Sequence, residues 1–233
     1  MTLRTRLPEA NRPPALAPIL ALALCMGGTA MAAGDGDIAL PKPRLDGEVS
    51  VERALALRRS VREFAPEPLP LAAVSQLLWA AQGITDPPER RTAPSAGALY
   101  PLEVYLVAGA VSGLRPGVYR YELRRHRLVL ESAGDRRADV ADAALGQDWV
   151  GEAPAIVVLA AVYQRTARKY GERAPRYVHM EVGHAAQNVY LQAAALSLGT
   201  CMVGAFHDEQ LKRVLKLPAE VEVLGIMPVG HPD

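Results

Sequence analysis

The stretch RRSVREF, residues 58–64, places two guanidinium groups and a hydroxyl at steps of two. It lies where a predicted helix gives way to extended chain, and extended chain directs alternate side chains to one side. Arg58, Ser60 and Arg62 gathered there could hold a phosphate dianion through charge-assisted hydrogen bonds. A solvated basic helix end, where arginine also suits the helix dipole, explains the same residues, and on composition alone it is the better explanation.

Two further stretches are poor in side chains. Residues 94–101 read PSAGALYP, and residues 201–206 read CMVGAF, with Gly204 and Ala205 at the small centre. Small residues let backbone N–H groups approach a flat ring or a phosphate closely. Tight packing of a loop under a helix explains the first stretch equally well, and a strand with a glycine bulge explains the second.

Hydrophobic periodicity and the positions of capping residues, Gly and Pro predict the helices and strands that must position these stretches. Ser50 is expected to cap a helix that leads into RRSVREF. A second helix, with Pro70 in its first turn, is expected to stop at Gly83. Strands are expected at 102–109, at 155–163 and in the closing EVEVLGIMPVG, and a hairpin at 117–122 and 127–131.

The remaining segments read as helices. DRRADVADAALGQ predicts a short helix, and a last short helix is expected to be capped by Asp208. The longest helix is predicted at about 176–198, ending at Gly199, with an apolar repeat on one face. A polar stripe on another face contains Glu181, His184, Asn188 and Gln192. Helices alternating with non-adjacent strands predict an α+β fold, a sheet with helices packed on it.

Composition narrows the possible functions. The 233 residues carry a formal net charge of +1, which gives no field for nucleic acid. P-loop, G-x-G-x-x-G and G-x-S-x-G motifs are missing, so neither a P-loop nor a Rossmann dinucleotide site is indicated, and a hydrolase is not favoured. The five histidines include no pair at i,i+4, and only two cysteines are present, so we expect no metal site.

The first 32 residues have the layout of a secretory signal peptide. Three arginines precede the apolar run ALAPILALALCMGG, and Ala30-Met31-Ala32 offers a cleavage site. We therefore expect export to the periplasm, an extended lead-in at 33–49 and a folded domain at 50–233. An uncleaved anchor or a misassigned start codon is the alternative.

The motifs together resemble a known family. RRSVREF, the closing VGHP, APSAGALYPLEVYLV and RKYGERAPRYVHMEVGHAAQNVYLQAAALSLGTCMVGAF resemble the nitroreductase superfamily of FMN enzymes. They are closer to its SagB/ThcOx-type branch, which contains azoline oxidases. The resemblance covers nearly all of 50–233 and rests on the common order of motifs that are individually weak.

The resemblance implies a cofactor, FMN, and a place for it. Arg58, Ser60 and Arg62 would hold its phosphate and ribityl chain, with Arg59 beside them. The isoalloxazine ring would be lined by Pro94, Ser95, Ala96, Gly97, Ala98 and Leu99. Val203, Gly204 and Ala205 would also lie at the ring, with the Gly204 N–H near flavin N5. The fold would be the nitroreductase-like α+β sandwich, a mixed sheet flanked by helices, in an intertwined homodimer with FMN at the interface.

Some residues indicate to which branch of the family the sequence is most similar. Lys169 and Tyr170 match the Lys-Tyr pair of azoline oxidases, which is taken to assist proton removal while the flavin takes hydride. An exposed helix end explains RKYG equally well. Ala98 stands where many nitroreductases have Asn, which fits the azoline-oxidase branch. Many members carry basic residues after the VGHP-like strand, whereas here the sequence stops at Asp233, so Arg58 and Arg62 are expected to carry more of the phosphate binding.

The expected function is an FMN-dependent oxidoreductase that passes hydride between an organic substrate or donor and flavin N5. The alternatives are an NAD(P)H-dependent nitro or quinone reductase, and an exported flavin-binding protein without turnover. A peptide-modifying azoline oxidase is a further possibility, and it would need a cyclodehydratase partner. The substrate class is a small molecule or a peptide.

Overall fold

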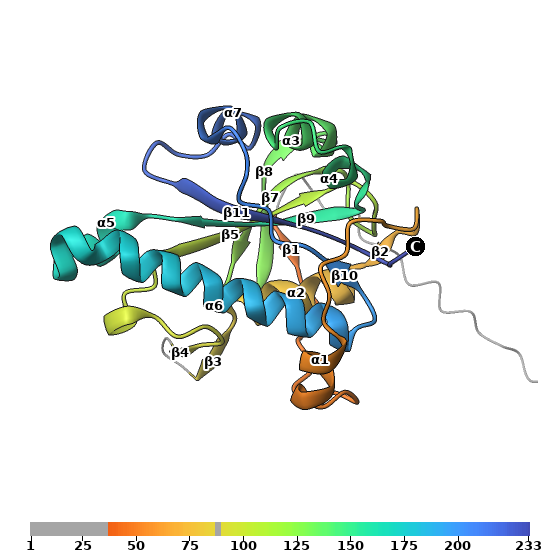
Figure 1. Ribbon diagram of the computed structural model, residues 1–233, viewed down its shortest axis with the longest axis horizontal. Coiled ribbons are helices and arrows are strands. Elements are labelled where there is room, and N and C mark those ends of the chain that lie inside the picture. The colour runs from red at the N-terminus through yellow and green to blue at the C-terminus, as the bar shows by residue number, and fades with distance from the viewer. Residues whose placement is uncertain (1–36, 87–89) are drawn as a thin grey trace, which may run out of the picture. The chain divides into compact units, whose positions relative to one another are not determined.

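A seven-stranded sheet lies at the centre of the computed structural model, which describes residues 37–86 and 90–233 (Figure 1). The strand order is β1-β8-β7-β5-β9-β11-β10, and neighbouring strands are antiparallel. The strands are β1 (Ile38–Ala39), β5 (Leu102–Ala108), β7 (Gly117–Glu122), β8 (Arg127–Ala133), β9 (Ala155–Ala161), β10 (Gly199–Thr200) and β11 (Glu222–Gly230). Ser60 forms a parallel bridge with Thr200 at the β10 edge, so the sheet is mixed, as predicted.

Helices cover both faces of this sheet. Figure 1 shows α3, α4 and α7 on one side and α1, α2 and α6 on the other, which confirms the predicted α+β sandwich. The helices are α1 (Val51–Leu57), α2 (Leu71–Gln82), α3 (Arg137–Ala143), α4 (Asp148–Glu152), α5 (Tyr163–Tyr170), α6 (Ala174–Ala195) and α7 (Asp208–Val214). Short elements complete the described chain: β2 (Leu69–Pro70), β3 (Ile84–Asp86), β4 (Arg90–Arg91), β6 (Val111–Ser112), and the 3-10 turns η1 (Ala96–Ala98) and η2 (Gly171–Arg173).

The central strand β9 explains why the chain forms two layers of helix. All of its residues are buried, as its uninterrupted apolar run predicts. Because side chains alternate along a strand, Val157 and Leu159 enter the core under α2 and α6, whereas Ile156 and Val158 enter the core under α3 and α7. Each face of the strand therefore needs its own covering helices.

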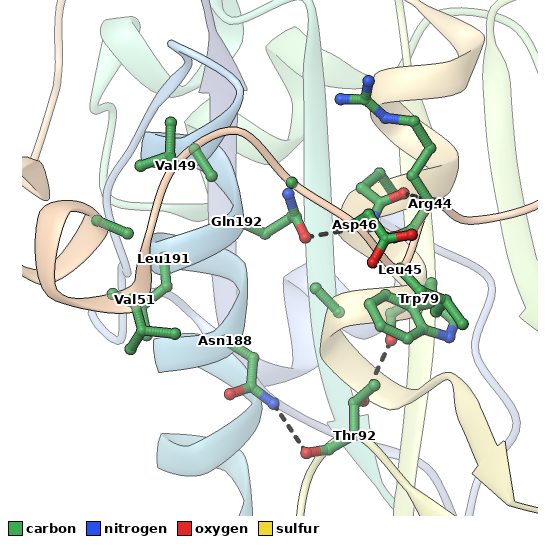
Figure 2. A pocket seen from close by; sticks show the side chains of 15 residues that line it. Arg44, Leu45, Asp46, Val49, Val51, Trp79, Thr92, Asn188, Leu191 and Gln192 are labelled. Carbon is green, nitrogen blue, oxygen red and sulfur yellow. Dashed lines mark hydrogen bonds between the residues drawn. The ribbon is translucent and has the colours of Figure 1, made fainter.

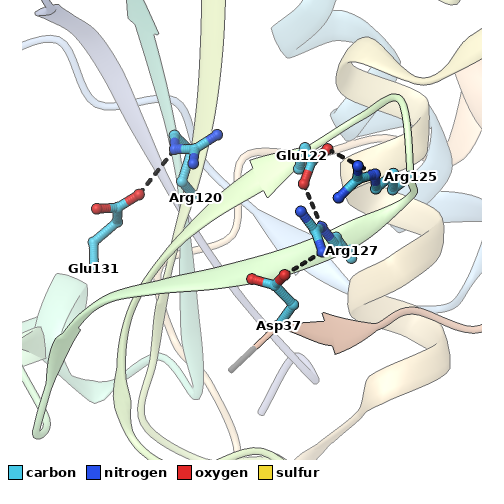
Figure 3. A network of polar contacts seen from close by, with 6 residues as sticks. All are labelled: Asp37, Arg120, Glu122, Arg125, Arg127 and Glu131. Atoms are coloured by element: carbon cyan, nitrogen blue, oxygen red, sulfur yellow. Dashed lines mark hydrogen bonds and ion pairs between the residues drawn. The ribbon is translucent and has the colours of Figure 1, made fainter. Parts of the chain in front are cut away.

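One ion pair links the residues before α1 to the outer hairpin, and further ion pairs lie within the hairpin, as Figure 3 shows. Arg127 on β8 pairs with both Asp37 and Glu122, and Arg125 lies 3.8 Å from Glu122. Farther along the same hairpin, Arg120 and Glu131 pair across the strands at 2.8 Å. The segment 37–39 is thus held as the edge strand β1, paired with β8.

Several local predictions are confirmed. Ser50 caps α1, where its hydroxyl accepts a hydrogen bond from the Arg53 N–H at 3.2 Å. Gly83 is the C-terminal cap of α2, and the hairpin of β7 and β8 forms where the alternation predicted it. Pro70 is the residue just before α2 and not part of its first turn.

Several boundaries differ from the predictions. The strand expected at 155–163 ends at Ala161, and its last expected residue instead begins α5, a helix that the sequence reading missed. Helix α6 ends at Ala195 because the Leu198 N–H turns back to the Ala193 carbonyl at 2.8 Å, ahead of the predicted stop. Asp208 is the first residue of α7, and His207 is its cap.

Gly199 serves a close approach rather than a helix stop. A Cβ at this position would lie 2.6 Å from Val61, which no real side chain tolerates. The absence of a side chain lets the segment after α1 enter the sheet edge, where the Val61 N–H donates to the Thr200 carbonyl at 3.0 Å. RRSVREF is thereby fixed against the start of CMVGAF.

The predicted signal peptide, residues 1–32, lies outside the described residues. Within the part that is described, no helix is long and apolar enough to span a bilayer.

Candidate functional site

Tyr190 of α6 brings two of the three predicted stretches together. The guanidinium carbon of Arg58 lies 5.3 Å from the centre of its ring, and the Ser60 hydroxyl lies 3.4 Å from its hydroxyl. The same Tyr190 hydroxyl accepts the Met202 N–H at 2.7 Å. The sequence reading did not select Tyr190; its only signal was an aromatic residue late in the long helix.

The other arginines of RRSVREF point to different partners. Arg62 lies over the ring of Trp149, 5.8 Å from its centre, on the α4 side. Arg59 folds back onto the end of α1, where its Nη1 donates to the carbonyls of Ala56 and Arg58 at 3.0 and 2.7 Å. Arg59 thus resembles the basic helix end considered as the alternative, whereas Arg58 and Ser60 share one partner.

CMVGAF contacts Tyr190 through Met202 and the sheet through Val203, and its next two residues are exposed. The N–H of Val203 donates to the Ile226 carbonyl at 2.8 Å, which docks the buried Val203 on β11. Gly204 and Ala205 are exposed, and a Cβ on Gly204 would meet nothing within 4 Å. No described residue accepts a hydrogen bond from the Gly204 N–H, so this donor is available to a ligand.

A cavity of about 320 Å³ lies beside the Tyr190 cluster. Arg58, Arg59, Val61, Tyr190 and Thr200 line it, together with the residues that end α6. Guanidinium and hydroxyl donors at a cavity wall are the groups that bind a phosphate, so the chemistry of this corner fits the phosphate end of FMN.

The loop of PSAGALYP adopts an unusual backbone. Gly97, Ala98 and Tyr100 all have positive φ, at 62°, 54° and 47°. For the two non-glycine residues this conformation is uncommon and costs about 1–3 kcal/mol each. The Ser95 hydroxyl closes the loop by accepting the Tyr100 N–H at 2.9 Å, and Ala98 donates to the Ser95 carbonyl at 3.1 Å. Pro94, Gly97 and Ala98 are exposed, while Ala96 and Leu99 are half-buried.

Lys169 and Tyr170, at the end of α5, reach this loop. A Cβ on Gly97 would lie 2.9 Å from the Tyr170 hydroxyl and 3.1 Å from Lys169 Nζ. The Tyr170 ring is held edge-on against Tyr177 of α6, with ring centres 4.8 Å apart. The two side chains predicted to move protons therefore converge on the loop predicted to line the ring.

Glu181 lies behind the same loop, on α6. It is only 2 % exposed, and its Oε1 has no hydrogen-bond partner among the described residues. Burial raises the pKa of Glu181 to about 7, against a hydrogen bond from Ser95 and the charge of Arg91, which both lower it. Burial likewise lowers the pKa of the Arg91 guanidinium, which lies 4.2 Å from the centre of the Tyr100 ring.

The rest of the predicted polar stripe pins neighbouring segments to α6. Figure 2 shows Asn188 donating to the Thr92 carbonyl, at 3.2 Å, beside a cavity of about 390 Å³. Gln192 accepts from Gln76 of α2 at 3.2 Å, and Gln76 in turn bonds both backbone groups of Arg44. His184 alone of the stripe is exposed. Asn188 thus holds the segment that precedes the loop, and Gln192 helps to hold α2 against α6.

The two groups of site residues, one around Tyr190 and one around the loop near Glu181, lie at different positions along α6. Tyr190 follows Glu181 by nine residues, which is about 13 Å along a helix axis. Figure 1 shows α1 near the C-terminal part of α6, whereas the N-terminal part of α6 follows α5. Within one chain, Arg58 and Ser60 are therefore gathered at one position, and the loop with Lys169 and Tyr170 at another.

Comparison with known proteins gives the family. The model of the nitroreductase family matches residues 55–231. The chain belongs to the nitroreductase family. The protein MJ1384 of Methanocaldococcus jannaschii, which carries a nitroreductase name, is 48 % identical over 184 residues, 79 % of this chain and 92 % of its own.

Two other relatives are informative. The crystal structure of a Ralstonia eutropha protein, also named as a nitroreductase, superposes with a TM-score of 0.73 at 33 % identity, covering 84 % of this chain and 90 % of its own. The trifolitoxin-processing protein TfxB of Rhizobium leguminosarum is 28 % identical over 138 residues, 57 % of this chain and 37 % of its own. The chain is thus related to oxidoreductases of the nitroreductase family, and it has the predicted fold.

Among the described residues, no group of His, Cys, Asp and Glu is arranged to hold a metal ion. The candidate site is built from cations, hydroxyls and open backbone, and those groups suit an anionic organic cofactor.

Proposed function

We propose that this nitroreductase-family chain is an FMN-dependent oxidoreductase that transfers hydride between an organic substrate or donor and flavin N5. When bound, FMN would supply the hydride chemistry, and the chain would supply binding, orientation and proton handling. The observation that carries the proposal is the convergence of Lys169 and Tyr170 on Gly97, in a family whose relatives carry nitroreductase names.

Each predicted group has a task in this proposal. Arg58 and Ser60, gathered at Tyr190, hold the phosphate and ribityl chain, with Arg62 nearby and Arg59 in a lesser role. The open N–H of Gly204 faces the ring near N5. Lys169 or Tyr170 takes the proton that leaves the substrate when its hydride departs.

We further propose that the flavin lies between two copies of the chain. The separation of the Arg58 corner from the loop along α6 supports this, because a second copy can bring the missing half to each site. Helix α1 offers a surface for such a partner: it buries only Ala54, while Val51, Leu55 and Leu57 are 65 %, 52 % and 43 % exposed. Val51 also lines the cavity in Figure 2. Light scattering of the purified protein tests the homodimer.

Arg58→Ala tests the cofactor assignment. It should greatly reduce the flavin that the purified protein retains, whereas Arg53→Ala, an exposed arginine on the same helix, should leave it unchanged. Equal retention in both variants would remove Arg58 from the phosphate site.

The finer assignment is a dehydrogenase of the SagB/ThcOx type. The likeness to TfxB, the Lys169-Tyr170 pair and Ala98 support it. The signal-like residues 1–32 lead us to propose export to the periplasm, where reduced nicotinamides are not expected. Export therefore favours a dehydrogenase or oxidase reaction.

An NAD(P)H-dependent nitro or quinone reductase is the second candidate, favoured by the nitroreductase name of the 48 % identical relative. Steady-state assays with NADPH and a nitroaromatic or quinone separate the two. High kcat/KM with these substrates would replace the first proposal. Flavin retention with no turnover of any donor would instead indicate a binding protein.

A further inference from the structure

Helix α5 carries the two side chains that reach the loop, Lys169 and Tyr170, yet it buries only Thr166. Its start is fixed by the main chain, since the Val162 N–H donates to the Pro101 carbonyl at 2.9 Å. Ring contacts join both of its ends to α6. A helix with so few buried apolar contacts depends on the polar contacts of its side chains for its position against the loop.

Arg165 joins α5 to the loop 95–100. Its Nη1 donates to the Tyr100 carbonyl at 3.3 Å, and its Nη2 bonds and pairs with the Glu103 carboxylate near the start of β5. A guanidinium presents its N–H groups as a planar fork, so one side chain can hold both acceptors at once. We call these two contacts the Arg165 clamp.

Tyr100 combines an uncommon backbone conformation with contacts on three sides. Its φ of 47° is strained for a residue that carries a side chain. The Ser95 hydroxyl accepts its N–H at 2.9 Å, and Arg91 lies 4.2 Å from the centre of its ring. Arg165 takes the remaining backbone group, the carbonyl. An exposed ion pair alone contributes little to stability, but here the same guanidinium also holds the carbonyl of a strained residue.

Arg165 and Lys169 lie one turn apart on α5. Residues four apart share a face of a helix and lie about 6 Å apart along its axis. The turn of Arg165 is bonded to the last residue of the loop, and the next turn places Lys169 Nζ and the Tyr170 hydroxyl at Gly97. The distance between these two side chains and the loop therefore depends on the Arg165 clamp.

We propose that Arg165 is a positioning residue that fixes α5 and the loop 95–100 to one another, and so sets where Lys169 and Tyr170 lie over the loop. Arg165 does not touch the reacting atoms and acts through the two side chains that follow it. The proposal rests on the proposed function only in taking those side chains to handle protons at the flavin. Without the clamp, α5 and the loop move apart, and a displacement of about 1 Å can slow a positioned reaction about 10²-fold.

Hydrogen exchange of the full-length protein, followed by mass spectrometry, tests whether the clamp holds the two segments. Arg165→Met should raise exchange about tenfold in the peptides covering 95–101 and 163–171 together, as for loss of a hydrogen bond to a charged group. A peptide covering β9, residues 155–161, should keep its protection, because that strand is buried in the sheet. Arg168→Met is the matched control: Arg168 is exposed on the same helix, and its loss should leave these peptides unchanged.

Arg165→Lys gives a second signature, which keeps the test valid if Arg165→Met folds poorly. Lysine keeps the charge but lacks the fork, so protection of the two peptides should lie between that of Arg165→Met and that of the unaltered protein. Equal exchange of the loop peptide in Arg165→Met and in the unaltered protein would overturn the proposal, and so would equal increases in Arg165→Met and Arg168→Met. An increase in every peptide, β9 included, would also overturn it, because Arg165 would then support the fold as a whole.

The midpoint potential of bound FMN connects the clamp with the site. A cation beside the ring favours the reduced, more negative flavin, so Lys169→Met should shift the potential to a more negative value. Arg165→Met should shift it in the same direction, and the double variant should go no further than Lys169→Met alone. Additive shifts would mean that Arg165 acts through its own charge, and they would overturn the positioning role.

FMN retention separates this inference from the proposed function. Arg165→Met should retain as much FMN as the unaltered protein, because the phosphate corner at Tyr190 is a separate part of the site. If the unaltered protein binds no FMN, the proposed function fails, and the hydrogen-exchange result alone decides whether Arg165 fixes α5 to the loop.

Discussion

Replacing Glu181 by Gln should make the protein more stable at alkaline pH and leave its stability nearly unchanged at acidic pH. Burial raises the pKa of Glu181 to about 7 in the folded state, from an ordinary 4.5. Between these values the folded protein binds more protons than the unfolded chain. The free energy of unfolding therefore falls as the pH rises through this window. Gln is close in shape to the protonated carboxyl and does not ionise.

The magnitude comes from the width of the window. A difference of one pKa unit is worth 1.36 kcal/mol, so the contribution of Glu181 between pH 5 and pH 8 is about 2–3 kcal/mol. Urea unfolding at pH 5, 6.5 and 8 measures it as the difference between the unaltered protein and the variant, in which other titrating groups cancel. The variant should gain stability relative to the unaltered protein as the pH rises, and His184→Gln should not.

Parallel stability profiles of the unaltered protein and Glu181→Gln would refute this reasoning. They would mean that Glu181 is as well solvated in the folded chain as in the unfolded one, or is already ionised at pH 5. A loss of stability in the variant at every pH would instead show that the carboxyl makes a hydrogen bond that the amide cannot replace.

Three further predictions concern the site. In urea unfolding, Gly97→Ala should destabilise the fold by about 1 kcal/mol more than Gly113→Ala. Both glycines have positive φ, but only at Gly97 would a Cβ meet neighbouring atoms. Equal losses of stability would mean that Tyr170 does not lie against Gly97. Tyr190→Phe should weaken FMN binding about fivefold in a fluorescence titration, through loss of one shared hydroxyl; an unchanged Kd would remove it from the site. Lys169→Met should lower kcat about 10²-fold with FMN retention unchanged, as for loss of a proton-transfer group; full activity would assign RKYG to a helix end.

Most of the framework could be predicted from the sequence, because it rests on local signals. The Ser50 cap, the stop at Gly83 and the hairpin each depend on residues near one another in the chain. The apolar run of β9 is also self-contained, since a strand covered on both faces must be apolar throughout. The sequence did not predict helix α5, because its polar residues show no apolar repeat. The helix buries only Thr166.

The arrangement of the site could be predicted only in part. Small residues at 94–101 and 201–206 signal close approach, but the partners that approach come from distant segments. Tyr190 gathers Arg58, Ser60 and Met202 through tertiary contacts that no local pattern encodes. Glu181 did carry a signal, since it lies three residues after Val178 and four before Ala185, on the face that proved buried. The polar stripe to which the sequence assigns Glu181 is therefore buried at this residue.

The central claim is that this fold holds a flavin. The most direct measurement is to purify the full-length protein, offer it FMN, remove the excess, denature it and identify the released cofactor by absorbance and mass. We predict that FMN is released in near-stoichiometric amount. Protein that retains no flavin under these conditions would contradict the account.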